Sequence, residues 1–122
     1  MKESQNILFV DSDPAIRKAF KDLLEGQGHV ITLASDADEA IGMMHSHINA
    51  YNLIVTDLDL KGSGSGIRVI EEGYIFQVKC EFWLVSASLD NDEAQLAFRA
   101  GAKVAVNKVE LNLKLHKEGY IP

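Results

Sequence analysis

The sequence predicts an α/β protein in which a parallel β-sheet is covered by helices on both faces. Short apolar runs alternate along the chain with longer segments whose apolar residues recur every three or four positions. Short runs rich in β-branched and aromatic residues are typical of strands buried on both faces, and their alternation with amphipathic helices is typical of a parallel sheet. The length of 122 residues, with 47% hydrophobic and 25% charged residues, suits one folded domain.

The first strand is followed by a helix with clear signals at both ends. Residues 7–10 form the first apolar run. The helix predicted over residues 15–25 follows Asp13, a favoured N-cap residue, and Pro14, which suits the first helical turn. Gly26 can end this helix, because glycine is common at helix C-termini.

The next strand, helix and strand follow in the same order. A second strand is predicted over residues 30–33 and a second helix from residue 35 to about residue 45. Asp36 and Glu39 have the spacing of a capping box at the start of that helix. Residues 53–55 form the third apolar run.

The alternation continues through the second half of the chain. A third helix follows Gly66, although Gly73 interrupts its pattern. We expect the glycine- and serine-rich residues 62–66 to form a flexible loop. The remaining predicted elements are strands over residues 82–85 and 104–106, a helix over residues 91–100, and a short, weakly patterned helix over residues 112–118.

The large side chains allow simple predictions about burial. Trp83 lies in a predicted strand and is expected in the core, as are Phe9, Phe20 and Phe98. His29 has no evident partner in the sequence, so we expect it at the surface.

Composition excludes several classes of function. The formal charge of −6 argues against a broad nucleic-acid surface, which needs clustered positive charge. No apolar run approaches the roughly 20 residues of a membrane span, and the first residues lack the apolar core of a signal peptide. The single cysteine, Cys80, cannot form an internal disulfide. We therefore expect a cytoplasmic protein without direct nucleic-acid or membrane binding.

Candidate site residues follow four of the predicted strands. Binding sites in open α/β sheets form beyond the carboxyl ends of the strands. Asp11 follows the first strand, Asp57 the third, Ser86 the fourth and Lys108 the fifth. If these strands are neighbours, two carboxylates, a hydroxyl and an ammonium group converge at one edge of the sheet.

This combination of groups suits phosphoryl chemistry. Adjacent strands lie ~4.8 Å apart, so Asp11 and Asp57 can share one divalent cation, and oxygen ligands favour Mg²⁺. A cation, Lys108 and the Ser86 hydroxyl would surround Asp57 with groups that stabilise phosphoryl oxygens. Asp57 itself can act as a nucleophile that becomes an aspartyl phosphate.

The chain resembles the receiver domain of two-component response regulators. The resemblance covers roughly residues 6 to 110, and its motifs occur in the right order at the right strand ends. The matching stretches are residues 7–17, 53–60, 83–87 and 97–108. It implies a flavodoxin-like, doubly wound, five-stranded parallel sheet of order 2-1-3-4-5.

The resemblance also implies a function and its residues. A sensor histidine kinase or a phosphotransfer protein would transfer a phosphoryl group to Asp57. Asp11, Asp57 and the backbone carbonyl at Asp59 would bind Mg²⁺, while Ser86 and Lys108 would contact the phosphoryl group. The domain would signal to an unknown downstream protein, with no enzyme activity beyond self-catalysed phosphotransfer and dephosphorylation.

The sequence departs from the family pattern at several positions. Ser12 replaces the second of two adjacent acids, so we expect weak Mg²⁺ binding and slow or conditional phosphorylation. The family's proline after the lysine is Val109, for which a trans peptide bond is expected because a cis bond would cost ~3–4 kcal/mol. The family's proline after the phosphorylated aspartate is Lys61, and its aromatic switch residue in the last strand is Ala105.

Two alternative functions fit the sequence less well. A degenerate receiver would keep the fold and act as a phosphorylation-independent protein-binding module, as the replacement at Ser12 suggests. Asp57 and Asp59 also resemble the Asp-x-Asp start of haloacid-dehalogenase-type phosphatases, but in those enzymes this strand comes first.

We expect one receiver domain over residues 1–122, with its core at about 6–118 and no output domain in the chain.

Overall fold

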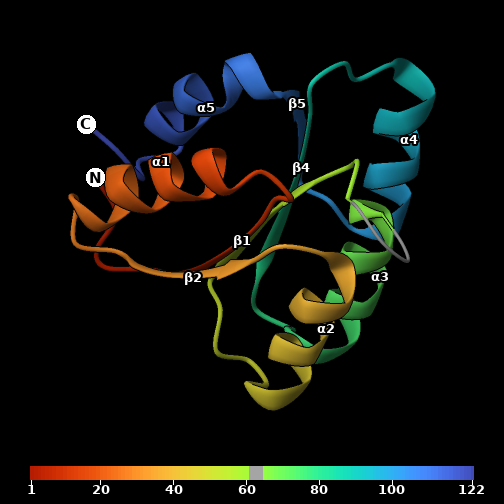
Figure 1. Cartoon of the computed structure of the whole chain (residues 1–122), viewed down its shortest axis with the longest axis horizontal. Coiled ribbons are helices and arrows are strands. Elements are labelled where there is room, and N and C mark those ends of the chain that lie inside the picture. The colour runs from red at the N-terminus through yellow and green to blue at the C-terminus, as the bar shows by residue number, and fades with distance from the viewer. Residues whose placement is uncertain (61–64) are drawn as a thin grey trace.

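The fold is a five-stranded parallel sheet between two layers of helices (Figure 1). The computed structural model describes residues 1–60 and 65–122. Lys61 and most of the loop predicted over residues 62–66 lie outside the described residues. The strands are β1 (Asn6–Val10), β2 (Val30–Ala34), β3 (Leu53–Asp57), β4 (Glu81–Ser86) and β5 (Val104–Asn107). The helices are α1 (Pro14–Glu25), α2 (Ala37–Ser46), α3 (Gly66–Phe76), α4 (Asn91–Ala100), the 3-10 turn η1 (Lys108–Glu110) and α5 (Leu111–Lys117).

The strand order is β2-β1-β3-β4-β5, as the resemblance implies. All four pairings are parallel. The carboxyl ends of all five strands therefore point to the same edge of the sheet.

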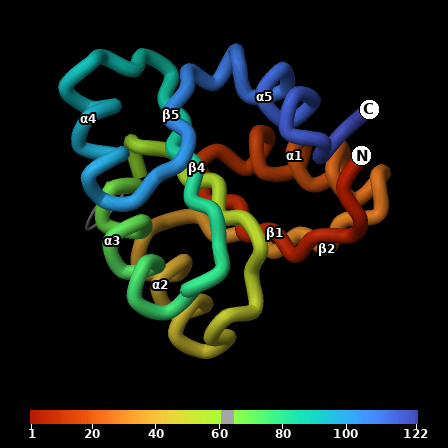
Figure 2. The backbone as a smooth tube through the Cα atoms, turned by 180° about the vertical axis from the view of Figure 1, so that it is seen from behind, coloured from red at the N-terminus to blue at the C-terminus, as the bar shows by residue number. Residues whose placement is uncertain are grey.

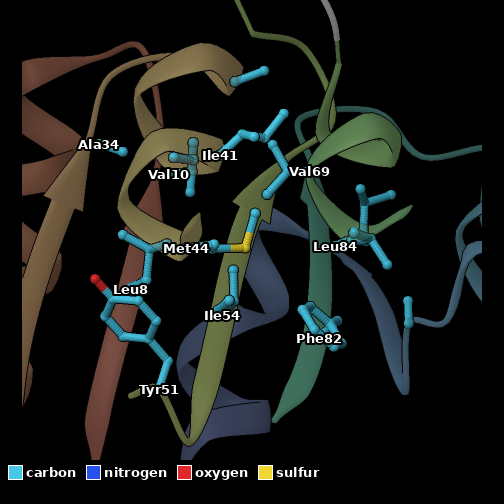
Figure 3. Close-up of a cluster of buried hydrophobic side chains, with 14 of the residues drawn as sticks. Leu8, Val10, Ala34, Ile41, Met44, Tyr51, Ile54, Val69, Phe82 and Leu84 are labelled. Atoms are coloured by element: carbon cyan, nitrogen blue, oxygen red, sulfur yellow. The ribbon is translucent and has the colours of Figure 1, made fainter. Parts of the chain in front are cut away.

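The two faces of the sheet carry separate apolar clusters. Helices α1 and α5 cover one face, while α2, α3 and α4 cover the other, as both views show (Figures 1 and 2). Successive residues of β1 serve opposite faces: Phe9 stacks on Phe20 of α1 with ring centroids 3.9 Å apart, whereas Leu8 packs toward α2. Figure 3 shows this second cluster, in which Met44 and Val69 meet over Ile54.

Gly73 is a packing site and does not interrupt α3. The helix runs unbroken through this position. A Cβ atom on Gly73 would lie 2.4 Å from the ring of Phe82 and 3.0 Å from the sulfur of Met44. The lack of a side chain therefore lets α3 approach the sheet closely.

Two predictions of burial are wrong. His29 is 4% exposed because its Nδ1 accepts a hydrogen bond from the Gln5 amide while its Nε2 lies 2.8 Å from the Tyr120 carbonyl oxygen. Phe98 is 47% exposed, because α4 packs through Ala97 on the neighbouring helix face. Trp83, Phe9 and Phe20 are buried as predicted.

Two further details of the helices differ from prediction. Asp36 caps α2 as predicted, but Glu39 accepts a hydrogen bond from the Ser35 amide, one residue before the position that a capping box requires. Helix α5 begins at Leu111, directly after η1.

Within the described residues, no helix is both long enough and apolar enough to span a bilayer.

Candidate functional site

Asp11, Asp57 and Lys108 meet at the carboxyl edge of the sheet. Asp11 directly follows β1, Asp57 is the last residue of β3, and Lys108 directly follows β5. The Lys108 Nζ lies 3.0 Å from Asp57 Oδ2 and 3.0 Å from Asp11 Oδ2. One ammonium group thus bridges two carboxylates that come from adjacent central strands.

Both carboxylates are buried, whereas the lysine reaches solvent. Asp11 is 1% exposed and Asp57 is 5% exposed, against 26% for the Lys108 side chain. Among the described residues, Asp11 Oδ2 accepts no bond of good hydrogen-bonding geometry, so the nearby ammonium charge is its main compensation. A buried carboxylate oxygen without a hydrogen bond can still bind a cation or accept a hydrogen bond.

Burial and the neighbouring charges act against each other on the pKa values of the site. Burial raises the pKa of the Asp57 carboxyl above its ordinary value, and the charge of Asp11 adds to this, although Lys108 opposes it. Burial also acts to lower the pKa of Lys108, but the hydrogen bond and charge of Asp57, together with Asp11, outweigh it and raise that pKa. The lysine therefore stays charged while holding two carboxylates close together.

The backbone after β1 fixes the orientation of Asp11. Its Oδ1 accepts a hydrogen bond of 2.9 Å from the Asp13 amide, and its carbonyl oxygen accepts one of 2.6 Å from the Arg17 guanidinium. Asp13 is exposed and caps α1 through the Ala15 amide, as predicted. Asp13 therefore serves the helix, and Ser12, which is half-buried, leaves the site one acid short.

Ser86 lies at the same edge, but the side chain of Asp59 does not face inward. Ser86 ends β4, is 1% exposed, and its Oγ accepts a hydrogen bond from the Ser88 amide. The Asp59 amide donates a bond of 3.3 Å to Asp57 Oδ1, while the Asp59 side chain is exposed. Asp59 thus contributes backbone to the site.

The residues present suit a hard divalent cation with few protein ligands. Asp11 and Asp57 place two carboxylate oxygens around one positive group, which matches the oxygen ligands of Mg²⁺. Within residues 1–60 and 65–122, no cluster of three or more acidic, histidine or cysteine side chains could hold a metal ion. The donor set therefore fits Mg²⁺ but is smaller than a full protein cage.

An apolar groove adjoins the charged groups. It has a volume of about 350 Å³ and lies between α1 and the start of α5. Phe9 and Phe20 line one part of it, and Val109, which is 93% exposed, lines another.

The peptide bond between Lys108 and Val109 is trans, as predicted.

The sequence did not reveal the backbone contacts of two residues that lie beside the site. Arg17 binds the carbonyl of Asp11, and the Asn107 side chain accepts a 2.8 Å hydrogen bond from the Leu89 amide. Their positions gave a signal, since Arg17 lies in the first helix after Asp11 and Asn107 directly precedes Lys108. Their partners are backbone groups, which sequence patterns do not reveal.

A comparison with protein-family models decides the classification. The model described as the response regulator receiver domain matches residues 7–118. The chain belongs to this family. Its flavodoxin-like sheet order agrees with that membership.

Individual relatives are similar along most of this receiver domain. The transcriptional regulatory protein ComA of Bacillus subtilis is 26% identical over 113 residues, which cover 91% of this chain and 52% of ComA. The chain thus spans about half the length of this curated relative.

Solved structures show the same fold. A response regulator from Burkholderia pseudomallei, solved with a phosphorylated aspartic acid, a calcium ion and citrate, has a TM-score of 0.79 at 23% identity, covering 86% of this chain and 60% of the other. The response regulator TrrA from Thermotoga maritima, solved in complex with Mg(2+)-BeF, has a TM-score of 0.77 at 26% identity, covering 96% and 99%.

Proposed function

We propose that this receiver domain accepts a phosphoryl group on Asp57 from a histidine kinase or phosphotransfer protein and signals through protein contacts. The observation that carries this proposal is the buried Asp57 carboxylate with the Lys108 ammonium 3.0 Å away. The related structures with a phosphorylated aspartic acid and with Mg(2+)-BeF support it.

The chemistry follows from the groups around Asp57. An Asp57 carboxylate oxygen forms a bond to phosphorus while the bond from phosphorus to the donor's imidazole nitrogen breaks, and the imidazole leaves with the electron pair. Lys108 can then turn from the carboxylates to a phosphoryl oxygen, and the Ser86 hydroxyl can donate to another.

Asp11 and Asp57, with the backbone carbonyl at Asp59, are the groups that would hold Mg²⁺. The ion supplies neutralising charge to the oxygens of the transferred group. Because Ser12 offers no carboxylate, we propose that this binding is weak and that phosphorylation is slow.

A mass measurement tests the function. Wild-type protein incubated with acetyl phosphate and Mg²⁺ is expected to gain one phosphoryl group, whereas Asp57→Asn gains none because the nucleophile is gone. Asp13→Asn is the matched control: it makes the same chemical change at a neighbouring acid while preserving the N-cap of α1, so it gains the group like wild type. Equal gain by Asp57→Asn would contradict the assignment of the residue.

The missing acid at Ser12 favours one second candidate, a degenerate receiver that binds proteins without phosphorylation. If wild-type protein gains no phosphoryl group from acetyl phosphate or from a phosphorylated histidine donor, this binding module becomes the better description. A fast, stoichiometric gain of a phosphoryl group would contradict both the degenerate-receiver hypothesis and the proposed slow reaction.

A further inference from the structure

Three consecutive backbone amides between β4 and α4 donate hydrogen bonds to side-chain oxygens. The Ser88 amide donates to Ser86 Oγ at 3.2 Å, and the Leu89 amide donates to Asn107 Oδ1 at 2.8 Å. The Asp90 amide donates to Glu93 Oε1 at 3.1 Å within the capping box of α4. This loop therefore depends on specific side-chain oxygens for its conformation.

Two of those oxygens come from neighbouring strand ends at the candidate site. Ser86 and Asn107 are paired in register as the last residues of β4 and β5. Asn107 directly precedes Lys108, and its Nδ2 donates to Glu110 Oε1 at 3.2 Å in the turn that carries the lysine. One half-buried amide thus joins the lysine turn to the loop before α4.

Movement of Leu89 would be transmitted to α4. The Leu89 side chain packs against the apolar cluster beneath α2 and α3. The next residue, Asp90, caps α4 and forms a reciprocal pair with Glu93. Because a helix moves as a unit with its first turn, a change at Leu89 would reposition the exposed α4 residues Leu96 and Phe98.

We propose that Asn107 is a positioning residue that couples the charge state around Asp57 to the position of α4. The trigger in this inference, though not the contact itself, rests on the proposed phosphorylation of Asp57. A phosphoryl group would draw Lys108 away from the carboxylates and would attract the Ser86 hydroxyl. The first movement acts on Leu89 through Asn107, and the second acts on Ser88, so both reach the same loop.

Ala105, two residues before Asn107 in β5, has no aromatic ring that could transmit a movement of Ser86. Ala105 is the register partner of Leu84 and carries only a methyl group. Asn107 has the groups required, since its carbonyl oxygen accepts from Leu89 while its amide nitrogen donates to Glu110. Removing the side chain leaves the Leu89 amide without this acceptor.

Amide hydrogen exchange tests the local contact in the unphosphorylated protein. Asn107→Ala is expected to speed exchange at Leu89 roughly fivefold, the usual effect of one hydrogen bond. Glu110→Ala removes the other partner of the same side chain and should leave Leu89 exchange unchanged. The double change Asn107→Asp, Glu110→Gln exchanges acid and amide while keeping both hydrogen bonds and the net charge, so it should restore wild-type protection. Unchanged protection in Asn107→Ala overturns the proposal.

A mutant cycle tests the coupling without requiring phosphorylation. Asp57→Asn removes the carboxylate charge beside Lys108, and we expect it to shift the amide resonances of residues 91–100. That response should fall at least about threefold in the Asn107→Ala background. It should persist in the Glu110→Ala background and in the double variant Asn107→Asp, Glu110→Gln. An equal response in all backgrounds overturns the coupling.

Phosphorylation by acetyl phosphate separates this inference from the proposed function. Asn107→Ala should accept the group within about threefold of the wild-type rate, while α4 no longer shifts its resonances. A loss of rate beyond about tenfold would place Asn107 in phosphoryl transfer and overturn its assignment as a coupling residue. If wild type gains no group but the mutant cycle behaves as expected, the proposed function fails and the coupling stands.

Discussion

At the scale of single residues, the site is defined by one ammonium group between two buried carboxylates. Lys108 is equidistant from Asp11 and Asp57, at 3.0 Å from each. Ser12 stands where the family resemblance implies a further acid, and Asp13 caps α1. The local negative charge is therefore smaller than the family pattern provides.

Restoring the acid at position 12 should strengthen Mg²⁺ binding. We predict that Ser12→Asp lowers the Mg²⁺ dissociation constant roughly tenfold, because it adds a carboxylate next to the proposed ligands. A Mg²⁺ titration followed by the amide resonances of Asp57 and Asp59 measures it. Ser12→Asn, of similar shape without the charge, is the control and should bind like wild type. Equal affinities for the Asp and Asn variants would contradict the prediction.

Residues that contact distant parts of the chain were the hardest to predict. His29 was expected at the surface, yet it is held by Gln5 and Tyr120, which lie 24 and 91 residues away. Phe98 was expected in the core, but α4 buries the neighbouring Ala97 instead. In both cases the outcome depends on the tertiary position of the element, which a local pattern does not contain.

At the scale of elements, the start of α3 determines how closely that helix approaches β3. Gly66 is the first residue of α3, and its amide donates a 3.0 Å hydrogen bond to the Leu58 carbonyl. A Cβ atom at Gly66 would lie 2.2 Å from the backbone oxygen of Asp57. This position therefore supports the backbone of the proposed phosphorylation site.

A methyl group at this position should disturb both folding and phosphorylation. We predict that Gly66→Ala lowers the free energy of unfolding by about 1–3 kcal/mol, because the Asp57 backbone must move to relieve the overlap. Urea denaturation measures this change, and acetyl phosphate labelling should slow in parallel. Gly42→Ala in α2 is the matched control: nothing lies within 4 Å of its new Cβ, so helix propensity should stabilise that variant by about 0.5–1 kcal/mol.

Element types were easier to predict than their details. Buried parallel strands leave continuous apolar runs, and helix caps leave Asp and Gly at fixed offsets, so all five strands and the helices were found near their observed positions. The sequence also indicated which strand ends carry Asp11, Asp57 and Lys108. It did not show that Gly73 serves close packing or that Asn107 reaches Leu89, because both depend on which elements become neighbours.

At the scale of the whole molecule, contacts between the two ends of the chain close one side of the fold. The Lys2 amide donates to the Gly119 carbonyl at 2.6 Å, and the termini lie near each other in both views (Figures 1 and 2). Tyr120 is 2% exposed and packs edge-on against Trp83, with ring centroids 5.5 Å apart. The C-terminal residues thus complete the core that α1 and α5 share.

The buried phenol should make the protein sensitive to alkali. Burial raises the pKa of Tyr120 above the ordinary phenol value of 10.0, so the folded state keeps a proton that the unfolded chain releases. Stability should therefore fall as pH rises from about 10 toward the folded-state pKa. We predict that Tyr120→Phe makes this fall shallower in urea denaturation curves recorded at several alkaline pH values.

A second tyrosine provides the control for this measurement. Tyr74→Phe, at a ring that is 61% exposed, should keep the wild-type slope of stability against pH. A slope for Tyr120→Phe that matches wild type would contradict a role for the buried phenol.

The strand order also bears on how the chain can fold during synthesis. β1 emerges first and occupies an inner position, and β2 and β3 then add to its two sides. β4 and β5 extend the sheet outward in the order in which they are made, so no strand has to enter between two strands already paired. Assembly by successive edge addition means that no strand pair has to open before the next strand joins the sheet. The contact of His29 with the Tyr120 carbonyl requires a residue that follows β5, so it can form only after all five strands have been synthesised.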